Sequence, residues 1–128
     1  MKKKLFISVP MKGRTEENIK HDMDKMHKIA EAMFGESLEV IDSYVEEEPP
    51  ADTNTPVWYL GKSIQKLSEA DYFVGVGYLQ AFKGCEIEMQ IARQYNIPVA
   101  AIDIAYLLPD VAEIENRLWE SNKAAPLC

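Results

Sequence analysis

The 128-residue sequence is short of cysteine, of basic residues relative to acidic ones, and of long apolar runs. Its two cysteines are Cys85 and Cys128, and neither has a second Cys or a His at zinc-ligand spacing. His21 and His27 are six residues apart in a predicted helix and therefore point to different faces. We expect no disulfide bond between the cysteines and no metal site.

The charge balance and the missing apolar runs exclude two classes of partner. The 21 acidic residues outnumber the 14 basic ones, whereas a protein that grips a nucleic-acid polymer needs clustered Lys and Arg. The apolar run after the basic start covers only Leu5–Pro10, which is too short for a signal-peptide core or a membrane span. We therefore expect a cytoplasmic protein without a membrane partner, in which a single nucleotide remains a possible ligand.

Three familiar motifs are also absent. The sequence has no Gly-x-x-x-x-Gly-Lys-Ser/Thr phosphate loop, no Gly-x-Gly-x-x-Gly dinucleotide fingerprint and no Gly-x-Ser-x-Gly nucleophile elbow. Both histidines fall in the first predicted helix, so no Ser-His-Asp arrangement is indicated either.

Short apolar runs alternate with stretches of helical periodicity along the whole chain. The predicted strands are 5–9, 38–42, 72–76 and 98–103, and the predicted helices are 16–34, 56–70, 84–95 and 109–122. This alternation predicts an α/β fold in a single domain, 1–128: a doubly wound, flavodoxin-like or Rossmann-like parallel sheet of four to five strands with flanking helices. Residues 104–108 are compatible with an extra strand or a loop, and we expect 123–128 to be frayed.

Right-handed crossovers bring the carboxyl ends of parallel strands to one edge, where open α/β sheets bind ligands. Polar, aromatic and glycine residues follow the predicted strands there: Ser8, Asp42-Ser43-Tyr44, Gly77-Tyr78 and Asp103. Lys12 and Arg14 lie in the loop after the first strand, just before a helix. That loop is either an anion site or a plain polar turn.

The predicted helix after the third strand carries two acids near its start. Glu86 and Glu88 are two residues apart, so they project about 200° from each other on a helix and cannot share one pocket. Glu88 is in line with Gly84 and Ala92. A carboxylate in an apolar, hydroxyl-lined pocket suits attack on a cationic sugar carbon. Cys85 between them is expected to be a buried structural residue.

Five segments carry a resemblance to a known family. They are LFISVPMKG (5–13), IDSY (41–44), WYLGKS (58–63), EAD (69–71) and GCEIEMQIA (84–92). Over residues 4–103 the chain resembles the nucleoside 2-deoxyribosyltransferase superfamily, especially its short branch found in bacteria and their phages. The resemblance implies a single nucleoside 2-deoxyribosyltransferase-like domain that needs no cofactor.

In that superfamily a glutamate attacks the anomeric carbon of a 2-deoxynucleoside and releases the base, and a second base or water then takes the sugar. The resemblance places this nucleophile at Glu88. Related hydrolases hold a 5′-phosphate in the loop after the first strand, and relatives often complete their pockets with a neighbouring subunit, so we expect a homo-oligomer. The expected substrate-binding residues are Ser8, Lys12, Gly13, Arg14, Tyr44, Tyr59, Ser63, Tyr78 and Gly84, with the tyrosines stacking on the base or covering the pocket.

Three positions depart from the transferase pattern. Ser63 and Phe82 stand where the transferases have aspartates that act on the base and the sugar, and Phe6 stands where they have a tyrosine that holds the glutamate. These departures favour hydrolysis over base exchange. The alternatives are a non-catalytic nucleotide-binding module, a sensor or sequestering protein, and an interaction protein that binds no nucleotide.

Overall fold

The computed structural model describes residues 1–79 and 81–124, except for the side chains of residues 119 and 121–124. The predicted frayed end therefore lies largely outside the described residues. The elements are β1 (Lys3–Ser8), α1 (Glu16–Phe34), β2 (Leu38–Val40), α2 (Thr55–Leu67), β3 (Tyr72–Val76), α3 (Lys83–Gln94), β4 (Val99–Ile102), the 3-10 helix η1 (Ile104–Tyr106) and α4 (Pro109–Ala124). In the described part of the chain they form one four-stranded parallel sheet of order β2-β1-β3-β4. The predicted doubly wound α/β fold is confirmed.

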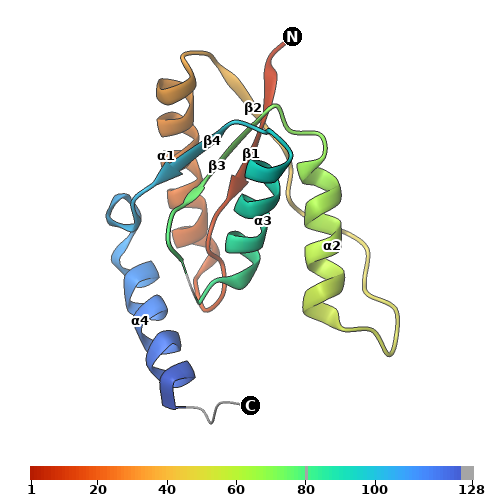
Figure 1. Cartoon of the computed structure of the whole chain (residues 1–128), viewed down its shortest axis with the longest axis vertical. Coiled ribbons are helices and arrows are strands. Elements are labelled where there is room, and N and C mark those ends of the chain that lie inside the picture. Colours follow the sequence, from red (N-terminus) through yellow and green to blue (C-terminus); the bar gives the residue numbers. More distant parts are fainter. Residues whose placement is uncertain (80, 125–128) are drawn as a thin grey trace.

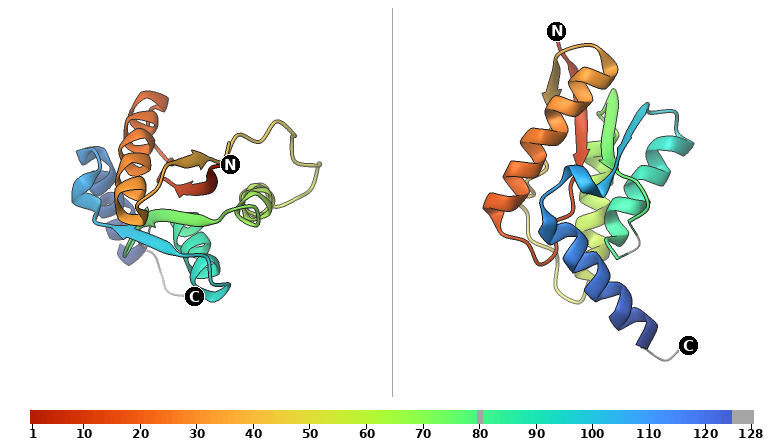
Figure 2. Two further views of the ribbon diagram at one scale, coloured as in Figure 1. Left: turned by 90° about the horizontal axis from the view of Figure 1, so that it is seen from above. Right: turned by 90° about the vertical axis from the view of Figure 1, so that its left-hand side faces the viewer.

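The sheet lies between two layers of helices, as Figures 1 and 2 show, and an apolar cluster fills each side. Successive side chains of a strand point to opposite faces, so Leu5 and Ile7 of β1 join one cluster and Phe6 joins the other. The first cluster packs against α1 and α4, and the second packs against α2 and α3. Burial on both faces explains why the strands read as continuous apolar runs in the sequence.

Local signals fix the helix ends. The Thr15 hydroxyl accepts a hydrogen bond from the Asn18 backbone N–H at 3.1 Å and caps α1, which ends at Gly35 with φ 74°. The Asn54 side chain caps α2 in the same way. The sequence of residues 104–108 is compatible with an extra strand or a loop, and the structure shows no strand there: residues 104–106 form a 3-10 turn. The Asp103 carboxylate caps this turn by accepting from the Ala105 N–H at 2.7 Å.

Three elements are shorter than the sequence indicates, and one of them is the strand predicted over 98–103, which covers only Val99–Ile102. The strand predicted over 38–42 ends at Val40, although Ile41 still donates to the Leu5 carbonyl at 2.9 Å. The helix predicted to reach residue 70 ends at Leu67. Among the residues described, no helix is both long and apolar enough to cross a membrane.

Candidate active site

A cavity of about 600 Å³ opens at the carboxyl end of β1, between the start of α3 and one side of α2. It has six of the residues that the sequence singles out along its wall: Ser8, Lys12, Tyr59, Ser63, Gly84 and Glu88. The elements that contribute them are far apart in sequence, and the order of the sheet brings them together. This is the ligand position expected of an open α/β sheet.

Glu88 lies at the centre of the polar contacts in this cavity. Its side chain projects from α3, and the residue is 8% exposed. The Ser8 hydroxyl from β1 donates to Oε1 at 2.8 Å, and the Ser63 hydroxyl from α2 donates to Oε2. Glu86 is exposed. The helical geometry that separates these two acids in the sequence therefore separates them in the structure.

Burial and hydrogen bonding shift the pKa of Glu88 in opposite directions. Burial raises the pKa of the carboxyl because a buried charge loses hydration, and the hydrogen bonds from Ser63 and Ser8 act against that rise. The net result is a pKa above the ordinary value. Such a group can act as a nucleophile or charge stabiliser once it is ionised, and as a proton donor before that.

Cys85 lines the same cavity, but its environment disfavours the reactive form. Burial raises the pKa of the thiol to about 12, against the opposing hydrogen bond with Ser8, so at neutral pH the group stays protonated. A thiol without its thiolate is a poor nucleophile. The residue is half-buried rather than fully buried, and its thiol is free among the described residues.

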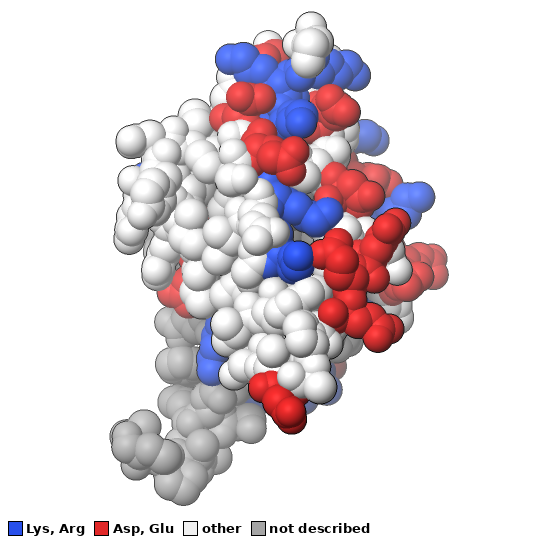
Figure 3. Space-filling model, turned by 90° about the vertical axis from the view of Figure 1, so that its right-hand side faces the viewer, with Lys and Arg blue, Asp and Glu red and all other residues white. Residues whose placement is uncertain are grey.

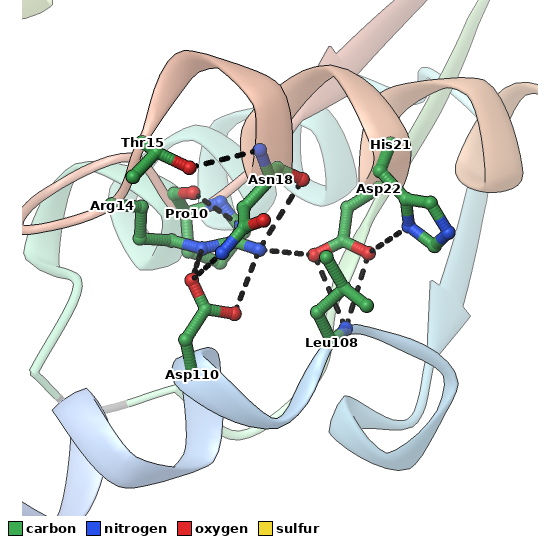
Figure 4. A network of polar contacts seen from close by, with 8 residues as sticks. All are labelled: Pro10, Arg14, Thr15, Asn18, His21, Asp22, Leu108 and Asp110. Carbon is green, nitrogen blue, oxygen red and sulfur yellow. Dashed lines mark hydrogen bonds and ion pairs between the residues drawn. The ribbon is translucent and has the colours of Figure 1, made fainter.

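Arg14 is not in the cavity wall, which corrects its predicted place in the phosphate-facing loop. Its guanidinium is fully buried and paired with Asp22, which is also fully buried, and with Asp110 at 2.8 Å (Figure 4). It also donates to the Pro10 carbonyl at 2.9 Å. None of these three partners lines the cavity around Glu88. Arg14 therefore ties the loop after β1 to α1 and α4 and has no free face for a ligand.

Three other predicted residues also lie outside the cavity around Glu88. Gly13 forms the turn before α1 with φ 76°, which places its backbone in the left-handed region. Tyr44 lines an adjoining cavity of about 700 Å³, which shares Tyr59 and three further residues with the first. Tyr78 is fully exposed, has φ 66°, and lines a separate cavity beside β4. Tyr44 and Tyr59 therefore both line the adjoining cavity, whereas Tyr78 lines the separate one.

The cavity also contains residues that the sequence did not single out. Lys83 begins α3 and lines the cavity together with Lys12. Its place just before Gly84 in the sequence is the signal that could have found it. Leu118 of α4 closes another side. Nothing in the sequence pairs Leu118 with a site formed by β1 and α3, because its position depends on how α4 docks.

Two lysines of α2 hold the segment after β2, and one of them, Lys62, pairs with Glu47 at 2.7 Å. The Lys66 ammonium donates to the carbonyls of Asp42 and Tyr44 at 2.7 and 2.9 Å. Asp42 in turn accepts from the Tyr44 N–H at 2.9 Å. These contacts fix Ser43 between the two carbonyls, where it lines the cavity around Glu88.

Neither histidine reaches this site. His21 contacts Asp22 at 3.3 Å, and His27 contacts the Leu38 carbonyl at 2.9 Å. Within the part of the chain that the structure describes, no three His, Cys, Asp or Glu residues are grouped as a metal site would need. Comparison with protein-family models, with curated proteins and with solved structures finds no match.

Proposed function

We propose that this protein cleaves the N-glycosidic bond of a nucleoside or nucleoside 5′-monophosphate, with Glu88 as the nucleophile. One observation carries the proposal: a buried carboxyl, oriented through both oxygens by hydroxyl donors, lines a cavity of about 600 Å³. The resemblance to nucleoside 2-deoxyribosyltransferases supports the same residue. We also propose that the protein is cytoplasmic.

The site contains the parts that this reaction needs at the sugar. Ser8 and Ser63 orient the carboxylate, and an apolar wall that includes Phe6 and Phe82 keeps water from its flanks. Attack of a Glu88 oxygen on C1′ forms a glycosyl-enzyme as the C1′–N bond breaks. Water then attacks C1′, which returns the carboxylate and releases the sugar.

Hydrolysis suits this cavity better than transfer between bases. Ser63 and Phe82 stand where transferases have acids, and Ser63 is engaged with Glu88 itself. A second incoming base would have to be activated by a side chain at one of these positions. Water needs less orientation, so it is the acceptor that we propose.

A non-catalytic nucleotide-binding module is the second candidate. Its support is the raised pKa of Glu88, because a carboxyl that keeps its proton can donate a hydrogen bond to a ligand without reacting. The same cavity would then sense or sequester an intact nucleotide.

We also propose that the chain forms a homo-oligomer. Val57 of α2 and Ile87 of α3 are exposed apolar residues, and Figure 3 shows a broad area over these two helices with few charged side chains. An uncharged face avoids repulsion between two copies that each carry a net charge of -7. Light scattering measures this directly, and a strictly monomeric mass would remove this part of the proposal.

Incubation with nucleosides and 5′-monophosphates, followed by chromatography for free base, tests the catalytic proposal. We expect base release, and we expect Glu88→Ala to reduce it by at least about a hundredfold because the group that attacks C1′ is gone. Glu86→Ala is the matched control, since Glu86 is exposed on the same helix. If ligand is bound and recovered intact, the binding module replaces the enzyme. If Glu88→Ala releases base as fast as the native chain, Glu88 is not the nucleophile.

A further inference from the structure

We infer that the substrate of this site is an N-glycoside whose base carries a permanent positive charge, such as a pyridinium nucleoside or nucleotide. The inference rests on the proposed function and names its substrate class.

Glu88 is the one carboxyl that lines the cavity among the residues whose side chains are described. Residues 80, 119 and 121–128 include no Asp, Glu or His side chain. Glu115 lines the separate cavity beside β4, and both its oxygens accept from the Ala81 N–H at 3.1 Å. The hydroxyls of Ser8 and Ser63, which donate to Glu88, add no acid to the site.

The other titratable side chains along the cavity are poor substitutes for a carboxylic acid. They are Lys12, Tyr59, Lys83 and Cys85. Amines, phenols and thiols as classes release a proton less readily than a carboxylic acid. A leaving base that must be protonated would therefore depend on Glu88 for the proton.

One carboxyl cannot serve both ends of the breaking bond at once. A neutral purine or pyrimidine leaves as an anion unless a proton reaches it, whereas attack on C1′ needs Glu88 in its ionised form. A cationic base removes this conflict. The electron pair of the C1′–N bond moves to the ring nitrogen and cancels its charge, so the base departs neutral without a proton donor.

The complete reaction is balanced with water as the only co-reactant. A Glu88 oxygen forms a bond to C1′ as the neutral base leaves. Water then attacks C1′, the bond between C1′ and the Glu88 oxygen breaks, and the carboxylate is restored. The proton of the water passes to solvent, so a cationic N-glycoside and water give a free sugar, a neutral base and one proton.

The surroundings of Glu88 also favour a cation. The Tyr59 ring lines the cavity, and an aromatic face attracts a flat cationic ring. Lys12 and Lys83 are both exposed, so water and salt screen their repulsion of such a base. The chain as a whole is acidic, with a net charge of -7, which raises the local concentration of cationic ligands.

The test compares two substrates that differ in the charge of the base. 7-Methylguanosine and guanosine, and their 2′-deoxy forms, are incubated with the protein at about pH 6, with nicotinamide mononucleotide as a further cationic probe. Each kcat/KM is divided by the uncatalysed rate, because cationic glycosides are intrinsically more labile. We expect this acceleration to be at least about a hundredfold larger for the cationic substrate. The neutral substrate needs a general acid that the site does not provide, and a general acid contributes a factor of about this size.

Variants and pH distinguish the possible outcomes. Glu88→Gln should abolish the acceleration, and Glu86→Gln should leave it unchanged. With nicotinamide mononucleotide, kcat/KM should rise with pH to a plateau, because ionised Glu88 is needed and no acid is. Equal acceleration of both members, or a decline of kcat/KM on the alkaline side, overturns the inference and leaves the proposed function in place. No base release from any probe rejects both.

Discussion

Arg14 places a buried guanidinium between two carboxylates, Asp22 and Asp110. Arg14 and Asp22 have fully buried side chains, and Asp110 is partly exposed. The Arg14 hydrogen bond lowers the pKa of Asp110, so this carboxyl remains ionised well into the acid range. Asp22 also accepts from the Leu108 N–H at 3.1 Å, so the cluster fixes the start of α4.

Removing Arg14 should cost far more stability than weakening its outer partner. Arg14→Met leaves the Asp22 charge buried without its counter-ion, and we expect a loss of about 3–5 kcal/mol. Asp110→Asn keeps the shape and weakens one charged hydrogen bond, for a loss of about 1.5 kcal/mol. Urea denaturation of both variants measures this. If Arg14→Met loses no more than Asp110→Asn, the pair with Asp22 is not the main interaction.

The residue scale shows why some site residues could be predicted and others could not. Helical geometry is local, so the sequence alone separates Glu86 from Glu88, and the family resemblance then selects Glu88. Arg14 looked like a phosphate ligand because its partners Asp22 and Asp110 are 8 and 96 residues away. Charge pairs across such separations depend on the docking of α1 and α4, which a single sequence does not specify.

At the scale of single elements, two glycines provide a matched pair for testing packing. A Cβ built on Gly75 in β3 would lie 2.8 Å from a ring carbon of Phe73 and 3.0 Å from the Met89 methyl carbon. Phe73 is fully buried and stacks on Phe6 at 5.7 Å, so it has little room to move. A Cβ on Gly61, in the interior of α2, would meet nothing within 4 Å.

Substitution by alanine should therefore change stability in opposite directions. We expect Gly75→Ala to lose about 1–3 kcal/mol through overpacking. Gly61→Ala should gain about 0.5–1 kcal/mol, because alanine restricts the unfolded chain and favours the helix. Thermal or urea unfolding of the two variants gives the comparison. A Gly75→Ala protein as stable as the native chain would show that β3 and α3 can separate at little cost.

Elements were predicted well where a local pattern was complete. The bounds of α1 follow from Thr15 and Gly35, which act within a few residues of the helix ends. The strand around β2 is predicted too long because Ile41 continues the apolar run, whereas the Asp42 carbonyl already accepts a hydrogen bond from Lys66 of α2. Because this contact comes from α2, the apolar residues of the strand itself could not predict where the strand ends.

For the whole molecule, two carboxyl groups with opposite shifts give an expected stability profile. Burial raises the folded-state pKa of Glu88 above its ordinary 4.5, so its contribution is complete below that value and is lost as pH rises through the raised pKa. The Arg14 hydrogen bond lowers the pKa of Asp110 below 3.8, so its contribution is complete above that value and is lost as pH falls. We expect the free energy of unfolding to be greatest at mildly acidic pH.

Urea denaturation from about pH 3 to about pH 9 measures this profile. Glu88→Gln is the informative variant, because its amide does not titrate and can still hydrogen-bond with both serine hydroxyls. It should reduce the decline on the alkaline side and leave the acid side unchanged. The chain's net charge of -7 adds repulsion at high pH in both proteins, so the difference between them isolates Glu88. If the native chain and Glu88→Gln give the same free energy of unfolding at every pH, Glu88 does not cause the decline on the alkaline side.

The parallel order of the sheet also determines when the site can form during folding. All the strand pairs are joined through helices, so none can begin as a hairpin. The hydrogen bond between Ser8 and Glu88 closes a span of 80 residues, and contacts so distant in sequence slow folding. The raised pKa of Glu88 can develop only after β1, α2 and α3 have packed together. In a refolding experiment, the titration of Glu88 would record the completion of the sheet rather than the early collapse of the chain.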